Sequence, residues 1–92
     1  MMNAIKKVTH LREQQHTLEG WIERVDHSNR RLHIRTGSRD KFGCTVLVPE
    51  QCEITHNLLH LQLHSLLPCD PVQIVYEEDD LGGRIARTVE IC

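Results

Sequence analysis

The chain has 92 residues, of which 39% are hydrophobic and 26% are charged, and its formal net charge is -2. This length excludes a multidomain enzyme, and this apolar content excludes a disordered tail. The three aromatic residues are Trp21, Phe42 and Tyr76. With so few aromatic side chains, we expect a core built from aliphatic residues.

The N-terminal residues lack the apolar run of a secretory signal, and no stretch approaches the roughly 20 apolar residues that span a bilayer. We therefore expect a cytoplasmic protein that does not contact a membrane. The four cysteines are Cys44, Cys52, Cys69 and Cys92. Their spacing fits neither a zinc knuckle nor a Cys-x-x-Cys redox pair, so reduced, buried thiols are favoured over a metal site or a disulfide.

The small net charge conceals a gradient along the chain. Residues 24–41 carry six Lys or Arg against two Asp, a net of +4, whereas residues 68–92 carry two Arg against six Asp or Glu, a net of -4. The basic segment suits contacts with phosphate. Charges interact mainly over short distances in salt solution, so a local basic segment can bind phosphate although the whole chain is acidic. Pairing of basic with acidic strands across a sheet explains the gradient equally well.

Alternating apolar and polar residues predict a first strand over 17–26 and a second over 31–36, joined by the turn residues 26–30. A polar loop, 37–43, precedes a β-branched third strand over 44–48 that Pro49 ends. Residues 71–77 and 84–91 predict two more strands, with a turn over 79–83.

The segment between these strand groups, residues 53–67, fits two patterns. Leu59, Leu63, Leu66 and Leu67 would share one helical face, whereas Leu59, Leu61 and Leu63 alternate as in a strand. We favour a helix over 55–67, because leucine has good helix propensity, Thr55 suits an N-cap and Pro68 would stop the helix.

Three strands, a helix and two strands, in that order, are typical of the all-β OB-fold, a five-stranded Greek-key barrel. Gly20 agrees, since a glycine allows the first barrel strand to bend sharply. We therefore expect a single OB-like domain over residues 1–92, with residues 1–15 as an N-terminal arm. An SH3-like barrel or an open α+β sheet are the alternatives if the middle segment is not a helix.

Residues 66–87 resemble bacterial translation initiation factor one and related S1-like domains. The resemblance lies in a leucine-proline segment before a valine-rich strand, an aspartate-leucine turn and the Gly83-Arg84-Ile85 strand start, with a weaker similarity at Leu18-Glu19-Gly20-Trp21-Ile22. It covers about a quarter of the chain. It implies an OB barrel and, by analogy, RNA binding.

A single-stranded nucleic acid, RNA before DNA, is the partner that this interpretation predicts. The second strand would bind the phosphates through Arg31, His33 and Arg35. The bases would stack on Trp21 and Phe42. The rim of this predicted interface consists of Arg24, Arg39 and Lys41. The same residues have an equally good structural explanation. Trp21 would cover the end of the barrel, Phe42 would fill the core, and the arginines would form a solvated face.

The alternative is a protein-interaction module in which the leucine-rich segment 58–67, with Leu58 and Leu61 exposed, contacts a protein partner or forms a homodimer. A helix would also align His56, His60 and His64, and whether that stripe binds a metal stays open. We expect no metal site and no cofactor. We also expect no enzymatic activity, because the sequence has no nucleophile elbow, phosphate-cradling loop or Walker motif.

Overall fold

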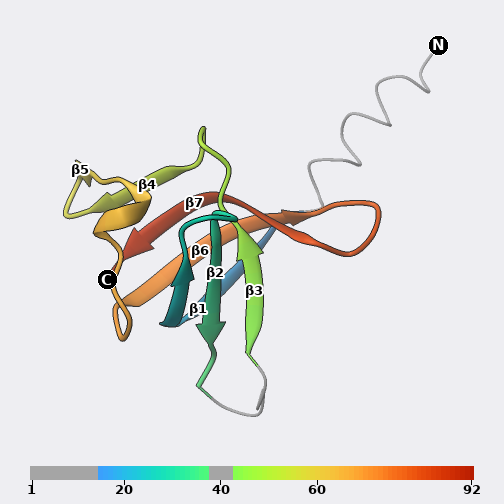
Figure 1. The fold of residues 1–92 in the computed structure, drawn as a ribbon, viewed down its shortest axis with the longest axis horizontal. Helices are drawn as coiled ribbons and strands as arrows, with labels where there is room; N and C mark the ends of the chain where they lie inside the picture. The colour runs from blue at the N-terminus through green and yellow to red at the C-terminus, as the bar shows by residue number, and fades with distance from the viewer. Residues whose placement is uncertain (1–14, 38–42) are drawn as a thin grey trace.

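The computed structural model of the chain describes residues 15–37 and 43–92 (Figure 1). The expected N-terminal arm therefore lies, apart from Gln15, outside the described residues. The described chain folds into seven strands and one 3-10 turn: β1 (Gln15–Asp26), β2 (Arg31–Arg35), β3 (Cys44–Leu47), β4 (Glu53–His56), β5 (Leu59–His60), η1 (Leu63–Ser65), β6 (Pro71–Glu78) and β7 (Arg84–Ile91). This part of the chain holds no helix long and apolar enough to cross a membrane.

The strands form one sheet in the order β3-β2-β1-β6-β7-β4-β5, and β3 also pairs with β7. The last pairing is parallel and joins Val46 to Arg84 and Leu47 to Ile85, whereas β1–β2, β2–β3, β1–β6 and β6–β7 are antiparallel. Five strands thus close on themselves with OB-like connectivity. The prediction of an all-β, OB-like barrel is confirmed.

The barrel interior is entirely aliphatic, as the composition predicts. Alternate residues of β2 and β6 point inward, so that Leu32, Ile34, Val72 and Ile74 are buried while the residues between them are not. The remaining core residues are Ile22, Val46, Val48, Ile54, Leu63, Leu66, Ala86 and Val89. No polar or charged residue is buried in the described part of the chain.

The predicted helix over 55–67 is wrong. β4 pairs in parallel with β7, from Glu53 opposite Thr88 to His56 opposite Ile91, and then turns back into β5. Asn57 and Leu58 form the two-residue turn, with φ of 52° and 70°, as a type I′ hairpin requires. Hydrogen bonding to the edge of β7 therefore overrides the helix propensity of the leucines. Beyond β5 the chain forms η1, in which Leu63 is buried. Leu66, directly after η1, is buried too.

Gly20 lies where β1 passes closest to the end of β2. A methyl group at this position would overlap the carbonyl oxygen of Arg35 and lie 3.0 Å from Cγ2 of Ile34. Because the first obstacle is backbone, no side-chain rotation relieves the overlap. The bend of β1 that allows it to pair with β6 over residues 15–21 and with β2 over residues 21–26 thus depends on glycine.

Substitution of Gly20 by alanine should lower the free energy of unfolding by about 1 to 3 kcal/mol, the usual cost of overpacking. Urea unfolding followed by circular dichroism measures the loss. Gly37→Ala is the matched control, because the nearest atom to its added methyl group is 3.9 Å away. Equal stabilities for the two variants would contradict the close approach at residue 20.

Candidate functional site

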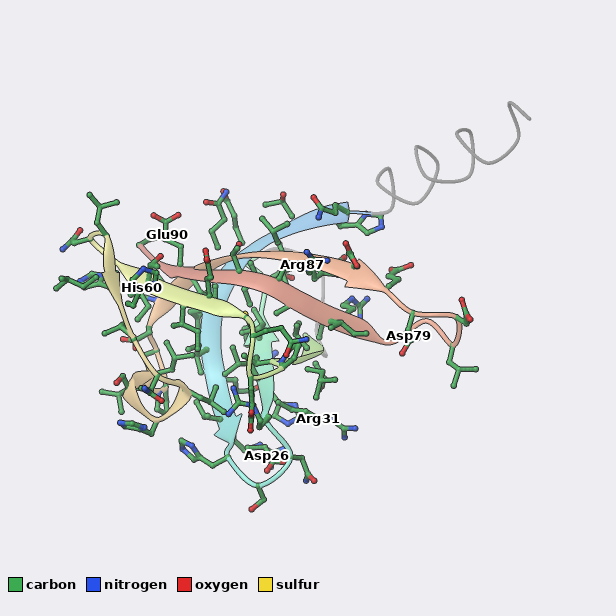
Figure 2. The ribbon with its side chains drawn as sticks, turned by 90° about the horizontal axis from the view of Figure 1, so that it is seen from above. Asp26, Arg31, His60, Asp79, Arg87 and Glu90 are labelled. Carbon is green, nitrogen blue, oxygen red and sulfur yellow. The ribbon has the colours of Figure 1, made fainter. Side chains whose placement is uncertain are left out.

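The predicted nucleic-acid-binding residues of β2 do share the outer face of the barrel. Arg31, His33 and Arg35 alternate with the buried Leu32 and Ile34. Figure 2 shows Arg31 close to Asp26, with which it pairs at the ends of β1 and β2 beside their turn. The neighbouring strand contributes Trp21, which lies opposite Arg35 and is 42% exposed. Arg39, Lys41 and Phe42 fall outside the described residues, so their predicted roles have no structural counterpart.

Internal contacts engage much of this basic face. The guanidinium of Arg24 donates to Nε2 of His33 at 3.0 Å, and Nδ1 of His33 lies 2.9 Å from the Thr45 hydroxyl oxygen. Since arginine only donates, Nε2 of His33 is the acceptor in this bond. Arg35 forms an ion pair with Glu23 at 3.3 Å. Glu23 lies in β1 where the register with β2 shifts. The face is therefore less positive than the sequence predicts.

The leucine-rich segment is exposed only in part. Leu58 is 93% exposed at the tip of the β4–β5 turn, and Leu59 beside it is 66% exposed. Leu61, in contrast, is partly buried against the core, and its N–H donates to the carbonyl oxygen of Ile54 at 2.8 Å. The prediction that Leu61 is exposed together with Leu58 is wrong, because the segment follows β4 back along the barrel.

The three histidines of the predicted stripe lie on three different elements. His56 belongs to β4, His60 to β5 and His64 to η1. His56 and His60 also project to opposite faces of their hairpin, since His56 pairs with Leu59 and His60 with Thr55. Within residues 15–37 and 43–92, no three His, Cys, Asp or Glu side chains are grouped to hold a metal ion.

A histidine and a cysteine do lie near one another in the sheet, because His56 at the end of β4 pairs with Ile91, the residue before Cys92. The imidazole of His56 donates from Nδ1 to the carbonyl oxygen of Ile91 at 3.2 Å. That carbonyl belongs to the peptide bond into Cys92, whose thiol is free and exposed. Among residues 15–37 and 43–92, the Asn57 amide is the one hydrogen-bond partner of His56 Nε2, at 3.4 Å. Sequence reasoning missed this pair, which we call the His56–Cys92 corner.

The thiols are less buried than the sequence predicts. Cys44 and Cys52 are half-buried, whereas Cys69 and Cys92 are exposed, and no disulfide joins any of the four. Burial raises the pKa of the Cys52 thiol from 9.0 to about 11, because the thiolate is poorly solvated there. Cys52 therefore stays protonated and weakly reactive at neutral pH, unlike a thiol that is open to solvent.

The raised pKa of Cys52 makes stability fall in alkali. Between pH 9 and pH 11, the unfolded chain releases this proton while the folded chain keeps it, so the unfolded state gains stability. The Tm of the wild type should therefore fall more steeply over this range than the Tm of Cys52→Ala, as measured by thermal unfolding at successive pH values. Parallel curves would refute the buried environment of this thiol.

Cys69 occupies a position that favours glycine. Asp70 donates its N–H to the carbonyl oxygen of Leu67 at 3.2 Å, which closes a turn over residues 67–70. Pro68 stands second in this turn and Cys69 third, with φ of 77°, as in a type II turn. The Asp70 carboxylate also accepts a hydrogen bond from the Leu67 N–H at 3.0 Å. The turn thus forces a side-chain-bearing residue into the left-handed region.

Cys69→Gly should stabilise the protein by about 1 kcal/mol, because glycine adopts this conformation without the steric cost of a Cβ atom. Chemical unfolding of the two proteins under reducing conditions measures the difference. Cys69→Ala serves as the control, since it removes the thiol but keeps the Cβ atom. A gain in stability for Cys69→Ala equal to that for Cys69→Gly would assign the effect to the thiol instead.

Comparison with known proteins identifies the fold through structure alone. No family model matches the chain, and no curated protein matches its sequence. A tryptophan-to-alanine variant of Escherichia coli CusF with Cu(II) is similar with a TM-score of 0.65 and 8% identity, over 86% of this chain and 92% of that chain. CusF with Ag(I) is similar with a TM-score of 0.64 and 8% identity, over 86% of this chain and 99% of that chain.

These findings correct several expectations. The resemblance to translation initiation factor one and S1-like domains is wrong, because no family model matches and the similar solved structures are both of CusF. The same structures overturn the expected single-stranded nucleic-acid partner and the cytoplasmic location, and they give the protein-interaction alternative no clear support. The expectation that the chain is not an enzyme agrees with them.

Proposed function

We propose that this barrel binds a soft monovalent metal ion, of the class of Cu(I) and Ag(I), as a cargo at the His56–Cys92 corner. The observation that carries the proposal is the hydrogen bond from His56 Nδ1 to the Ile91 carbonyl oxygen, directly beside Cys92. The likeness of the fold to CusF solved with Ag(I) supports it.

His56 has the hydrogen-bonding pattern of a metal-ligating histidine. Such a histidine commonly donates one ring N–H to a backbone carbonyl, which fixes the tautomer and directs the other nitrogen at the metal. Here the Ile91 carbonyl fixes Nδ1, and Nε2 is left with the 3.4 Å contact from the Asn57 amide. That contact is long for a hydrogen bond, so an ion would displace it at little cost.

Cys92 supplies the sulfur that selects a soft ion. Thiolate ligands favour Cu(I), and imidazole is also a suitable ligand for copper. The N–H of Cys92 donates to the carbonyl oxygen of Pro71 at 2.9 Å, which fixes the backbone of this residue beside the start of β6. Sγ of Cys92 lies 4.0 Å from the carbonyl oxygen of Glu90, and it would exchange this weak contact for the ion. Two donors suit a soft monovalent ion better than a divalent ion that prefers four ligands.

The test is a titration of the reduced protein with Ag(I), followed by the imidazole NMR signals. The Nε2 signal of His56 should shift as one equivalent is added, while those of His64, which lies in η1, should not. Competition with a chelator should then give an affinity that His56→Gln lowers by about tenfold or more. Cys92→Ser should lower it further, because it removes the sulfur ligand.

Cys69→Gly is the matched control, since it removes an equally exposed thiol without straining the backbone. Its affinity should equal that of the wild type. An affinity that falls as much in Cys69→Gly as in Cys92→Ser would mean that Ag(I) binds exposed thiols indiscriminately, and an unmoved His56 signal would remove the imidazole from the site. Either result overturns the proposal.

A further inference from the structure

A groove opens on the barrel wall where the chain passes from β3 to β4. Both strands pair with β7, with Leu47 opposite Ile85 and Glu53 opposite Thr88. Five residues, 48–52, therefore span a stretch that β7 covers with Ala86 and Arg87 alone. Val48 stays in the core, and the chain turns over residues 49–52, where the Cys52 N–H bonds to the Pro49 carbonyl oxygen. Beside this turn lies a hollow of about 620 Å³, within the range of small-molecule sites.

The segment over residues 48–52 is held in place, so the groove is formed in advance. The side chain of Arg30 donates from Nε to the carbonyl oxygen of Val48 at 2.8 Å and from Nη2 to that of Pro49 at 3.4 Å. The Cys52 N–H closes a turn onto the carbonyl oxygen of Pro49 at 3.0 Å. These bonds fix the segment from both ends, and a preformed hollow lowers the cost of ordering on binding.

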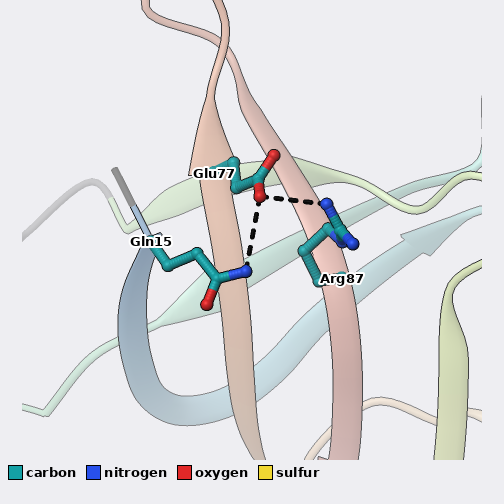
Figure 3. A network of polar contacts seen from close by, with 3 residues as sticks. All are labelled: Gln15, Glu77 and Arg87. Atoms are coloured by element: carbon teal, nitrogen blue, oxygen red, sulfur yellow. Dashed lines mark hydrogen bonds and ion pairs between the residues drawn. The ribbon is translucent and has the colours of Figure 1, made fainter. Parts of the chain in front are cut away.

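A polar network crosses the opposite wall of the groove (Figure 3). Oε2 of Glu77 accepts hydrogen bonds from the Arg87 guanidinium at 2.9 Å and from the Gln15 amide at 3.3 Å. The other oxygen of Glu77 accepts no side-chain bond from the residues that the structure describes. The carboxylate of Glu53, which also lines the groove, has no such partner in that same part of the chain.

The charges of the lining define which ligand the groove favours. Two carboxylates, Glu53 and Glu77, stand against the single cation Arg87, so the lining carries a net charge of -1. The remaining surface is apolar where Pro49, Val75 and Ile85 contribute to it. A ligand that suits both parts has a positively charged group and a short hydrocarbon body, since it would compensate the carboxylates and cover the apolar surface.

We propose that this groove binds small aliphatic amines as their ammonium ions. The ammonium group has three N–H donors and contacts the carboxylates of Glu53 and Glu77, and the alkyl chain lies against Val75 and Ile85. This site is separate from the His56–Cys92 corner, because none of the residues that line the groove belongs to that corner.

The experiment titrates the protein with n-butylamine at pH 7 and follows the backbone amide signals by NMR. Signals of Ala86, Arg87 and Thr88 should shift saturably. n-Butanol, which has no charge, and butyrate, which has the opposite charge, should leave them unchanged at the same concentration. Glu53→Gln should weaken binding by about threefold to tenfold, because it removes the unpaired carboxylate.

Glu90→Gln is the matched control, since Glu90 also lies on β7 but does not line the groove. It should bind the amine as the wild type does. Three results would overturn the proposal: no saturable shift with n-butylamine, an equal response to n-butanol, or the same loss of affinity in Glu90→Gln as in Glu53→Gln. The last result would show a general attraction of cations to an acidic surface.

Discussion

The structure depends above all on the edge of β7 that faces β3 and β4. One edge of β7 pairs with β6, and the other takes β3 near its beginning and β4 near its end, both in parallel. The first of these pairings closes the barrel. The second places His56 opposite Ile91, the residue before Cys92. Between the two pairings, Pro49, Gln51 and Cys52 line the groove together with Arg87. The closure of the barrel, the His56–Cys92 corner and the groove therefore all depend on this one edge of β7.

The barrel strands could be predicted because their signals are local. Alternation marks Leu32 and Ile34 as inward-facing, and Pro49 marks the end of β3. Gly20 also indicates the bend of β1. Each of these patterns reports the conformation of the residues that carry it, so no knowledge of distant partners is needed. The aliphatic core follows in the same way, since the chain has few other side chains large enough to fill it.

The segment 53–67 could not be predicted, because what decides its structure lies some 35 residues away. Leucines at helical spacing favour a helix. Ile54 and His56 adopt a strand because their backbone pairs with the edge of β7. Asn57 is the one local signal, since it readily adopts the positive φ of a hairpin turn, but Leu58 beside it is an uncommon second turn residue. The wrong helix then led to a wrong face for Leu61 and to a histidine stripe that does not form.

The predicted interface on β2 illustrates another limit. The sequence correctly places Arg31, His33 and Arg35 on one outward face, but it does not show which charges are already engaged. The register shift in β1 that accompanies the Glu23–Arg35 ion pair has no sequence signature, and the bonds of His33 to Arg24 and Thr45 depend on two neighbouring strands. Composition counts cations, whereas function depends on the cations that remain available.

Barrel closure also orders the events of folding. Val46 and its partner Arg84 are separated by 38 positions in the chain, whereas the β1–β2 and β6–β7 pairs are hairpins between neighbouring segments. Pairings of high sequence separation carry the greater loop-closure cost and form late. The parallel contact of β4 with β7, which joins His56 to Ile91 over 35 positions, belongs to this late class, so His56 comes to lie beside Cys92 only late in folding. A partly folded or newly synthesised chain would expose its thiols without the imidazole beside them, and the two-donor corner is therefore a mark of the fully folded state.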